Sequence, residues 1–314
     1  MNVDMAIRKP VVRGSLALYP VFSDAPAAPA YLTGPGAEAA GVLAFTELGE
    51  GPSVPELLVA NHADQPVLLV EGEQVLGAKQ NRTLNASVLC AAKSQTTLPV
   101  SCVEAGRWDT PRSAARSRRN APGDLRRLKT ESVMASRRAG SGPRSDQAAV
   151  WERVDTYAAA LRAVSGTSAL EDVYGAVDDD LNALVVNLQP LPEQRGVLVA
   201  IGGQVRSLDL FDKASTLAAY WDGLVAGYAI DALHEKATEP ARADAEAFVA
   251  RLAGSSDTQQ TGVGLGTDHL LDGDGLVGAG LEWEGGFVHV AAFSTARDGH
   301  VARQRPIRRP FRRR

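Results

Sequence analysis

Residues 276–293 read LVGAGLEWEGGFVHVAAF, in which two apolar runs flank the turn Glu284-Gly285-Gly286. The first run spans Leu276 to Trp283 and the second spans Phe287 to Phe293, and each has the length and composition of a β-strand. Glycines at the turn allow the chain to reverse direction tightly. The stretch therefore predicts a β-hairpin, and with it an antiparallel sheet near the end of the chain.

Short apolar runs of the same kind recur along the chain. We expect strands at 16–22, 41–45, 57–60, 66–70, 74–77, 83–91, 96–104, 184–188, 197–201 and 205–211. Apolar residues at helical spacing predict helices at 146–164, 213–229 and 240–253. Because short, regularly spaced strands are typical of sandwiches and barrels, the sequence predicts an α+β fold with an antiparallel β-sandwich or barrel-like core and several flanking helices.

The segment 109–145 differs from its surroundings, since it is rich in Arg, Ser, Ala and Gly and is interrupted by three prolines. It is longer than an ordinary connection, and we interpret it as a basic flexible loop. The loop separates a β-rich N-terminal part, 1–108, from an α+β C-terminal part, 146–296. The C-terminal part either stands alone or forms one unit with the N-terminal sheet. Residues 297–314 form an arginine-rich tail.

Composition is that of an ordinary globular protein, with 45% hydrophobic and 22% charged residues and a net charge of -4. The charge is unevenly spread, because 107–144 holds eleven basic residues against three acidic ones and 297–314 holds eight arginines against one aspartate. These two segments could attract nucleic acid or an acidic protein. They would equally suit solvated loops, or loops that lie on the acidic remainder of the protein.

Several classes of protein are not indicated by the sequence. No run of about 18 apolar residues occurs, so we expect no membrane span. The N-terminus lacks the apolar run of a secretory signal, and two cysteines cannot form a disulfide framework, so we expect a cytoplasmic protein. The five histidines lack metal-ligand spacing. Gly262-Val-Gly264-Leu-Gly266 leads into acidic turn residues, unlike a dinucleotide fingerprint, and we predict neither a metal nor a cofactor.

The densest polar motif is 71–82, EGEQVLGAKQNR, which follows a predicted strand. Lys79 and Arg82 could bind a phosphate group, while Gln80 and Asn81 offer both hydrogen-bond donors and acceptors. Glu71 is a candidate general base. The alternative interpretation is a polar hairpin loop that carries ordinary surface charges.

A second motif covers 98–108, LPVSCVEAGRW. Glu104 at the end of the predicted strand is another candidate base, Arg107 could bind phosphate through two hydrogen bonds, and Trp108 could stack on a base or sugar. The alternative has Arg107 paired with Glu104 and Trp108 covering the core. Cys102 has apolar neighbours on its strand face, which favours a small core residue over a nucleophile.

Two further polar residues lie inside apolar runs. His289 shares a strand face with Phe287, Ala291 and Phe293, which is usual for a core histidine but leaves open a role as catalytic acid. Asp209 lies in the run Leu-Asp-Leu-Phe at 208–211. A carboxylate there needs a partner, so it could be part of a site.

Five motifs together resemble a bacterial and archaeal protein family that is named for its association with ADP-ribosylglycohydrolase and rhodanese-phosphatase proteins. They are 71–82, 99–108, Ser145-Asp146-Gln147 with Val150-Trp151, the run at 208–211, and Val288-His289 with Phe293. The resemblance covers most of the chain apart from the first residues and the tail. It implies ADP-ribose or nucleotide chemistry nearby, and it carries over no catalytic residues.

Three functional hypotheses follow from these motifs. The leading one is a cytoplasmic protein that binds an anionic, nucleotide-like ligand such as ADP-ribose through the residues Lys79, Gln80, Asn81, Arg82, Arg107 and Trp108. The second is a hydrolase or transferase that acts on a nucleotide or ADP-ribose derivative, with Glu71 or Glu104 as base and His289 as acid. The third is a nucleic-acid or protein-interaction module that uses 107–144 and 297–314.

Overall fold

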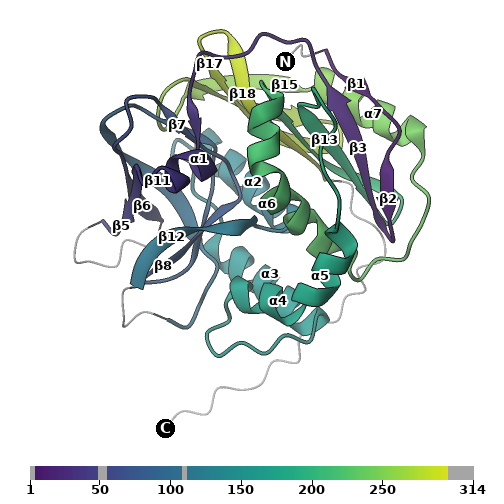
Figure 1. The fold of residues 1–314 in the computed structure, drawn as a ribbon, viewed down its shortest axis with the longest axis horizontal. Coiled ribbons are helices and arrows are strands. Elements are labelled where there is room, and N and C mark those ends of the chain that lie inside the picture. Colours follow the sequence, from purple (N-terminus) through teal and green to yellow (C-terminus); the bar gives the residue numbers. More distant parts are fainter. Residues whose placement is uncertain (1–3, 49–54, 108–111, 296–314) are drawn as a thin grey trace.

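The computed structural model describes residues 4–48, 55–107 and 112–295. In this part of the chain three β-sheets and seven helices pack together, and all strand pairs but one are antiparallel (Figure 1). One sheet is curved into a nearly closed, barrel-like form. The predicted α+β fold with an antiparallel, barrel-like core and flanking helices is confirmed.

The largest sheet has nine strands and contains the predicted C-terminal hairpin. Its order is β1 (Ala6–Ile7), β3 (Leu16–Phe22), β13 (Gly196–Ile201), β14 (Gln204–Phe211), β18 (Gly286–Ser294), β17 (Leu276–Trp283), β16 (Thr267–Gly273) and β15 (Ser256–Thr261), with β2 (Val11–Arg13) beside β3. The N-terminal strand β3 thus lies between β1 and a strand that follows it by some 170 residues along the chain.

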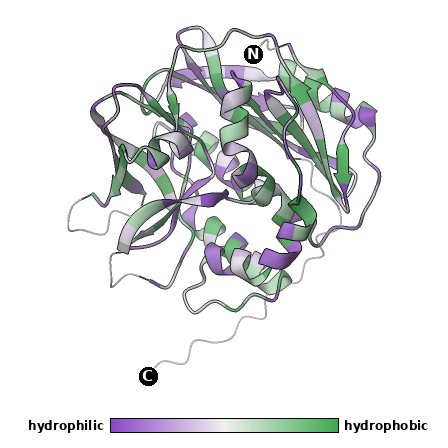
Figure 2. Cartoon of the chain, viewed as in Figure 1, coloured by the Kyte–Doolittle hydropathy of each residue, from purple (hydrophilic) through white to green (hydrophobic). Residues whose placement is uncertain are grey.

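Both faces of the central strands of this sheet are buried, which explains why β3 and β13 are apolar at consecutive positions, whereas the edge strand β15 is polar and mostly exposed. In β3, Leu16 and Leu18 pack on the side of helix α6 (Ala214–Ala232), while Ala17 and Tyr19 pack on the side of helix α7 (Arg242–Ala253). Side chains alternate between the two faces of a strand, so each face contributes to a different core. Hydrophobic and hydrophilic residues mix along the same strands in Figure 2.

The two smaller sheets come from the first 120 residues and share a third core. The six-stranded sheet has the order β12 (Arg112–Asn120), β8 (Glu73–Ala78), β9 (Arg82–Leu84), β11 (Ser94–Cys102), β6 (Glu56–Asn61) and β5 (Leu43–Thr46). The three-stranded sheet has the order β10 (Val88–Cys90), β7 (Val67–Leu69) and β4 (Leu32–Thr33). Their apolar side chains, among them Leu57, Val67, Val75 and Leu98, pack against each other.

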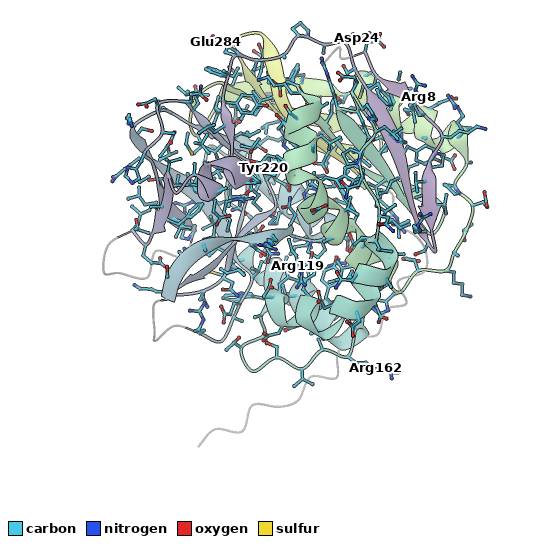
Figure 3. The ribbon with its side chains drawn as sticks, in the orientation of Figure 1. Arg8, Asp24, Arg119, Arg162, Tyr220 and Glu284 are labelled. Atoms are coloured by element: carbon cyan, nitrogen blue, oxygen red, sulfur yellow. The ribbon has the colours of Figure 1, made fainter. Side chains whose placement is uncertain are left out.

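The remaining helices are α1 (Gly34–Ala39), α2 (Gly123–Arg138), α3 (Gln147–Ala160), α4 (Leu170–Ala176) and α5 (Asp178–Val185). Helix α6 joins the sheets, because the Tyr220 hydroxyl donates to the carbonyl of Leu68 at 2.5 Å and accepts the N–H of Gly34 at 2.9 Å (Figure 3). Among the described helices, none has the length and apolar content needed to cross a membrane.

The prediction of a flexible loop over 109–145 is wrong for most of that segment, which forms strand β12 and helix α2. Several of its arginines form ion pairs with acidic residues of other elements, whereas Arg118 and Arg144 are exposed. Arg119, for example, extends from β12 and pairs with Glu171 of α4 at 3.5 Å (Figure 3). Arginines of the segment that form such pairs are Arg116, Arg119, Arg126, Arg137 and Arg138, while Arg127 pairs with Glu131 of its own helix.

Two strand predictions are also wrong. Residues 184 and 185 end helix α5 and 186–188 follow it outside any strand, and α5 begins with Asp178, Asp179 and Asp180, whose charges favour a helix N-terminus. The predicted strand 83–91 is divided into β9 and β10, because the chain turns at Asn85–Ser87. That interruption places Ser87 at the junction between two sheets.

The close approach of β12 to β8 depends on Gly77. Its φ is +97°, and a Cβ built there would lie 2.1 Å from the carbonyl oxygen of Ser113. We expect Gly77→Ala to lower the free energy of unfolding by about 3 kcal/mol or more, measured by chemical denaturation. Gly140, with φ of +72° and open space around it, is the matched control, and Gly140→Ala should cost only about 1 kcal/mol. Equal costs would refute the role of the close approach.

A buried carboxyl group supports the start of α2. Asp231 of α6 accepts the N–H of Asp124 at 3.0 Å and a hydrogen bond from the Tyr157 hydroxyl. Burial, together with the charge of Asp124, raises the pKa of Asp231 to about 7 from 3.8. The folded state therefore holds a proton that the unfolded chain releases near pH 4.

Because the pKa of Asp231 is raised by folding, its contribution to stability is full below about pH 4 and is lost as the pH rises through about 7. In the native protein, the free energy of unfolding should fall by up to about 4 kcal/mol as the pH rises across this range. Asp231→Asn should abolish this fall, because it removes the titrating group. Urea denaturation at several pH values measures it. Asp222→Asn, at an exposed aspartate of the same helix, should leave the pH dependence as in the native protein.

Candidate functional site

A buried arginine lies where α2 meets the large sheet. The Arg126 side chain is 1% exposed, and its guanidinium binds both oxygens of Asp209 in β14 at 2.7 and 3.0 Å. Its Nε donates to Oε2 of Glu71 at 2.7 Å. Gly72 makes room for this side chain, since a Cβ at Gly72 would lie 2.7 Å from Cδ of Arg126. The two carboxylates raise the pKa of Arg126 against the effect of burial.

Asp209 is the centre of a hydrogen-bond network. Besides Arg126, it accepts hydrogen bonds from the Tyr228 hydroxyl of α6 and, at 3.0 Å, from Nε2 of His289. Burial acts to raise the pKa of Asp209, but the charge of Arg126 and the bond from His289 outweigh it and hold this pKa well below its usual range. Asp209 is therefore ionised at neutral pH.

The network ends at a serine. Nδ1 of His289 lies 2.7 Å from Oγ of Ser87, in the turn between β9 and β10. Because ionised Asp209 can only accept, Nε2 of His289 carries the proton and Nδ1 of the neutral ring is free to accept from the Ser87 hydroxyl. Phe211 stacks on the His289 ring with centroids 4.6 Å apart and holds its plane. Ser87, His289 and Asp209 thus form a continuous chain of hydrogen bonds.

A cavity of about 30 Å³ borders this chain. It is lined by Glu71, Asn85, Ala86, Ser87, Thr130, Val133, Met134, Arg137, Asp268, Leu270, Ala279, Gly280, Leu281 and Ala291. Its volume suits one or two water molecules. Oε1 of Glu71 is buried and has no hydrogen-bond partner among the described residues. His289 and Asp209 are buried, whereas Ser87 is partly exposed.

A second buried cation lies near Glu71. Nζ of Lys129, one helical turn beyond Arg126 in α2, donates to Oγ1 of Thr83 at 3.1 Å and to the carbonyl of Leu84. Burial lowers the pKa of Lys129 to about 8, although the charge of Glu71 acts to raise it. With His289 neutral, Arg126, Asp209, Glu71 and protonated Lys129 carry no net charge together.

The residues predicted from the sequence fall into two groups. Glu71 and His289 are both in the network around Asp209. Glu104, Arg107 and Asn81 form a separate cluster, in which Arg107 binds both oxygens of Glu104 at 2.9 and 2.8 Å and the N–H of Asn81 donates to Glu104 at 3.0 Å. Burial acts to raise the pKa of Glu104, but its hydrogen bonds from Arg107 and Asn81 lower it below its usual range.

The other predicted ligand-binding residues adjoin the Glu104 cluster. Arg82 is buried and binds both oxygens of Glu47 at 3.1 and 3.0 Å, and the backbone N–H of Lys79 donates to the same carboxylate at 2.8 Å. The Gln80 side chain donates to the carbonyl of Ala105 at 3.4 Å. Trp108 lies outside the described residues. Binding of a ligand by these residues stays a prediction.

Cys102 is buried in β11, as its apolar strand neighbours indicate. Burial raises the pKa of its thiol to about 11, and the nearby charge of Arg82 only partly opposes this. A nucleophilic cysteine needs a thiolate, so the environment of Cys102 suits a core residue.

Ser87 and Arg126 were not singled out by the sequence. Ser87 lies inside an apolar stretch and carries no motif, so no sequence signal marks it. Arg126 is different, because Leu125, Lys129, Val133 and Arg137 recur near it at helical spacing, and all are buried. That periodicity could have predicted a helix with a cationic inner face.

The fold and the site define an α+β protein in which a buried Ser–His–Asp network borders a small cavity. The chain belongs to the family described as ARG and Rhodanese-Phosphatase-superfamily-associated Protein domain, ARPP-1, whose model matches residues 4–293. No curated protein matches the chain, and no solved structure matches it either. Family membership confirms the resemblance found in the sequence and leaves the chemistry to the site.

Removing one carboxylate from the buried arginine should be costly. We expect Asp209→Asn to lower the free energy of unfolding by about 3–5 kcal/mol, because Arg126 would keep its charge with only Glu71 opposite. Thermal and urea unfolding measure this. The matched control is Asp272→Asn, which breaks the exposed pair with Arg138 at the end of the same helix and should cost less than about 1 kcal/mol. Similar costs for the two variants would contradict this account of Arg126.

Proposed function

We propose that this protein is a cytoplasmic hydrolase that cleaves an ester bond in a nucleotide-like molecule, with Ser87 as its nucleophile. The observation that carries the proposal is the unbroken chain from Ser87 Oγ to His289 Nδ1, 2.7 Å, and from His289 Nε2 to Asp209 Oδ1, 3.0 Å. A nucleophile bonded to a base, which is itself oriented by a carboxylate, is the arrangement that acyl transfer uses on unrelated folds.

Each residue has a definite role in this reaction. Ser87 Oγ attacks the ester carbonyl carbon while its proton passes to Nδ1 of His289. The C–O bond to the alcohol then breaks, and the alcohol leaves with the proton from His289. Asp209 keeps the proton on Nε2 and stabilises the imidazolium cation that forms. The backbone N–H of Glu71 donates to Ser87 Oγ at 3.0 Å and favours negative charge on this oxygen.

Arg126 limits how strongly Asp209 can stabilise the imidazolium, because it binds both oxygens of that carboxylate. Glu71 compensates, since its own negative charge lies against the same guanidinium. The two carboxylates together balance the charges of Arg126 and protonated Lys129, so the imidazolium forms beside a cluster with no net positive charge.

The proposed substrate class is supported by the family name and by the sequence motifs. The family is named for ARG and rhodanese-phosphatase proteins, an association that supports a nucleotide or ADP-ribose derivative as substrate. Among the three hypotheses, the enzyme is favoured by the Ser87 chain. Simple ligand binding by Arg82 and Arg107 would require phosphates to compete with Glu47 and Glu104, which already pair with these arginines. Nucleic-acid binding by 107–144 would meet the same competition at Arg116, Arg119 and Arg126.

A fluorophosphonate probe tests the nucleophile without knowledge of the substrate. The folded protein should take up one label, located on Ser87 by peptide mass spectrometry, and Ser87→Ala should take up none. His289→Gln should slow labelling by about 10²–10⁴-fold, because the general base is lost.

Ser94→Ala is the control, since Ser94 is a partly buried serine whose hydroxyl only donates to the backbone of Ala91. It should label at the native rate. Label that persists in Ser87→Ala, or native folded protein that takes up none, would refute Ser87 as the nucleophile.

A further inference from the structure

The two oxygens of the Glu71 carboxylate have different environments. Oε2 accepts from Nε of Arg126 at 2.7 Å, whereas Oε1 is buried without a hydrogen-bond partner among the described residues. Leaving a buried carboxylate oxygen unpaired is costly, so such an atom calls for an explanation. The ion pair with Arg126 uses the charge of Glu71 and only one of its oxygens, Oε2. The other oxygen, Oε1, therefore does not contribute to this ion pair.

The cavity that Glu71 lines has the size of a water site, and a water molecule there is the natural hydrogen-bond partner of Oε1. A volume of about 30 Å³ suits one or two water molecules. Much of its wall is apolar, with Val133, Met134, Leu270 and Leu281 among the lining residues. A water molecule there would therefore bind Glu71, Ser87 or one of the few other polar side chains that line the cavity.

Glu71 and Ser87 are held next to each other by the backbone. The N–H of Glu71 donates to Oγ of Ser87 at 3.0 Å, and both residues line the cavity. An acyl group on Ser87 Oγ would consequently adjoin the space that suits water.

We propose that Glu71 is the general base for the second half of the reaction, in which water hydrolyses the acyl group from Ser87. This inference rests on the proposed function of Ser87. Water bound to Oε1 gives a proton to Glu71 as its oxygen attacks the carbonyl carbon of the ester. The bond from that carbon to Ser87 Oγ breaks, the carboxylic acid leaves, and the proton on Glu71 returns to Ser87 Oγ. Glu71 and Ser87 both end in their starting states.

Glu73 provides a matched control two residues away. It is buried like Glu71 and pairs with an arginine, Arg116, through Oε2. Its Oε1 accepts the N–H of Val70 at 2.6 Å, so both of its oxygens are bound. Glu73 does not line the cavity. Glu73→Gln therefore removes the same charge, and weakens a similar ion pair, without removing the carboxylate that faces the cavity.

The experiment uses p-nitrophenyl acetate and the full chain. Glu71→Gln should release one equivalent of p-nitrophenol and then stall, because deacylation slows by about 10²–10⁴-fold without the base. Intact-mass spectrometry should show an acetyl group that accumulates on Ser87. Glu73→Gln should turn over steadily without accumulation. Glu71→Asp, which keeps the charge beside Arg126 and withdraws the oxygen by one methylene, should also accumulate the adduct, and it serves if Glu71→Gln fails to fold.

The outcomes separate this inference from the proposed function. Deacylation at the native rate in Glu71→Gln would overturn the role of Glu71 while leaving Ser87 as the nucleophile. An equal stall in Glu73→Gln would also overturn it, because the effect would then follow from lost charge alone. If Ser87→Ala hydrolyses p-nitrophenyl acetate at the native rate, the proposed function itself fails.

Discussion

A guanidinium held away from water between two carboxylates is the interaction on which the interior depends. Arginine keeps its proton in proteins, so the charge of Arg126 must be balanced where it lies. Asp209 and Glu71 supply that balance and in doing so fix α2 against β14 and against the turn before β8. The same requirement turns the polar face of α2 inward, which brings Thr130 and Arg137 to the wall of the cavity.

The fold was predictable where local pattern and final burial agree. The C-terminal hairpin and the strands 197–201 and 205–211 were found because strands buried on both faces are apolar throughout. The segment 109–145 was missed, since composition assigns arginines to solvent whereas here most pair with carboxylates of distant elements. An acidic remainder and a basic segment within one chain could have indicated that the two bind each other, but not which residues meet.

The candidate site was predictable in part. Asp209 and His289 stood out because a charged or titratable side chain in an apolar setting needs a partner, and Glu71 stood out because it begins the dense polar motif 71–82. Ser87 could not be found, because a small hydroxyl residue in an apolar run is common and its turn was hidden inside a predicted strand. Arg82 and Arg107 were singled out from the sequence, but the sequence did not show which group each of them binds. Phosphate and carboxylate are both bound by the same guanidinium geometry, and Glu47, the partner of Arg82, is 35 residues away in the sequence.

The network joins parts of the chain that are made at very different times. Ser87 and His289 are 202 residues apart, and His289 lies on β18, the last described strand. A nascent chain that still lacks β18 holds the Ser87 hydroxyl without its histidine partner, and a misfolded chain with β18 detached does so as well. The order of synthesis therefore means that the Ser87–His289–Asp209 network can form only after β18 has been translated and inserted into the sheet.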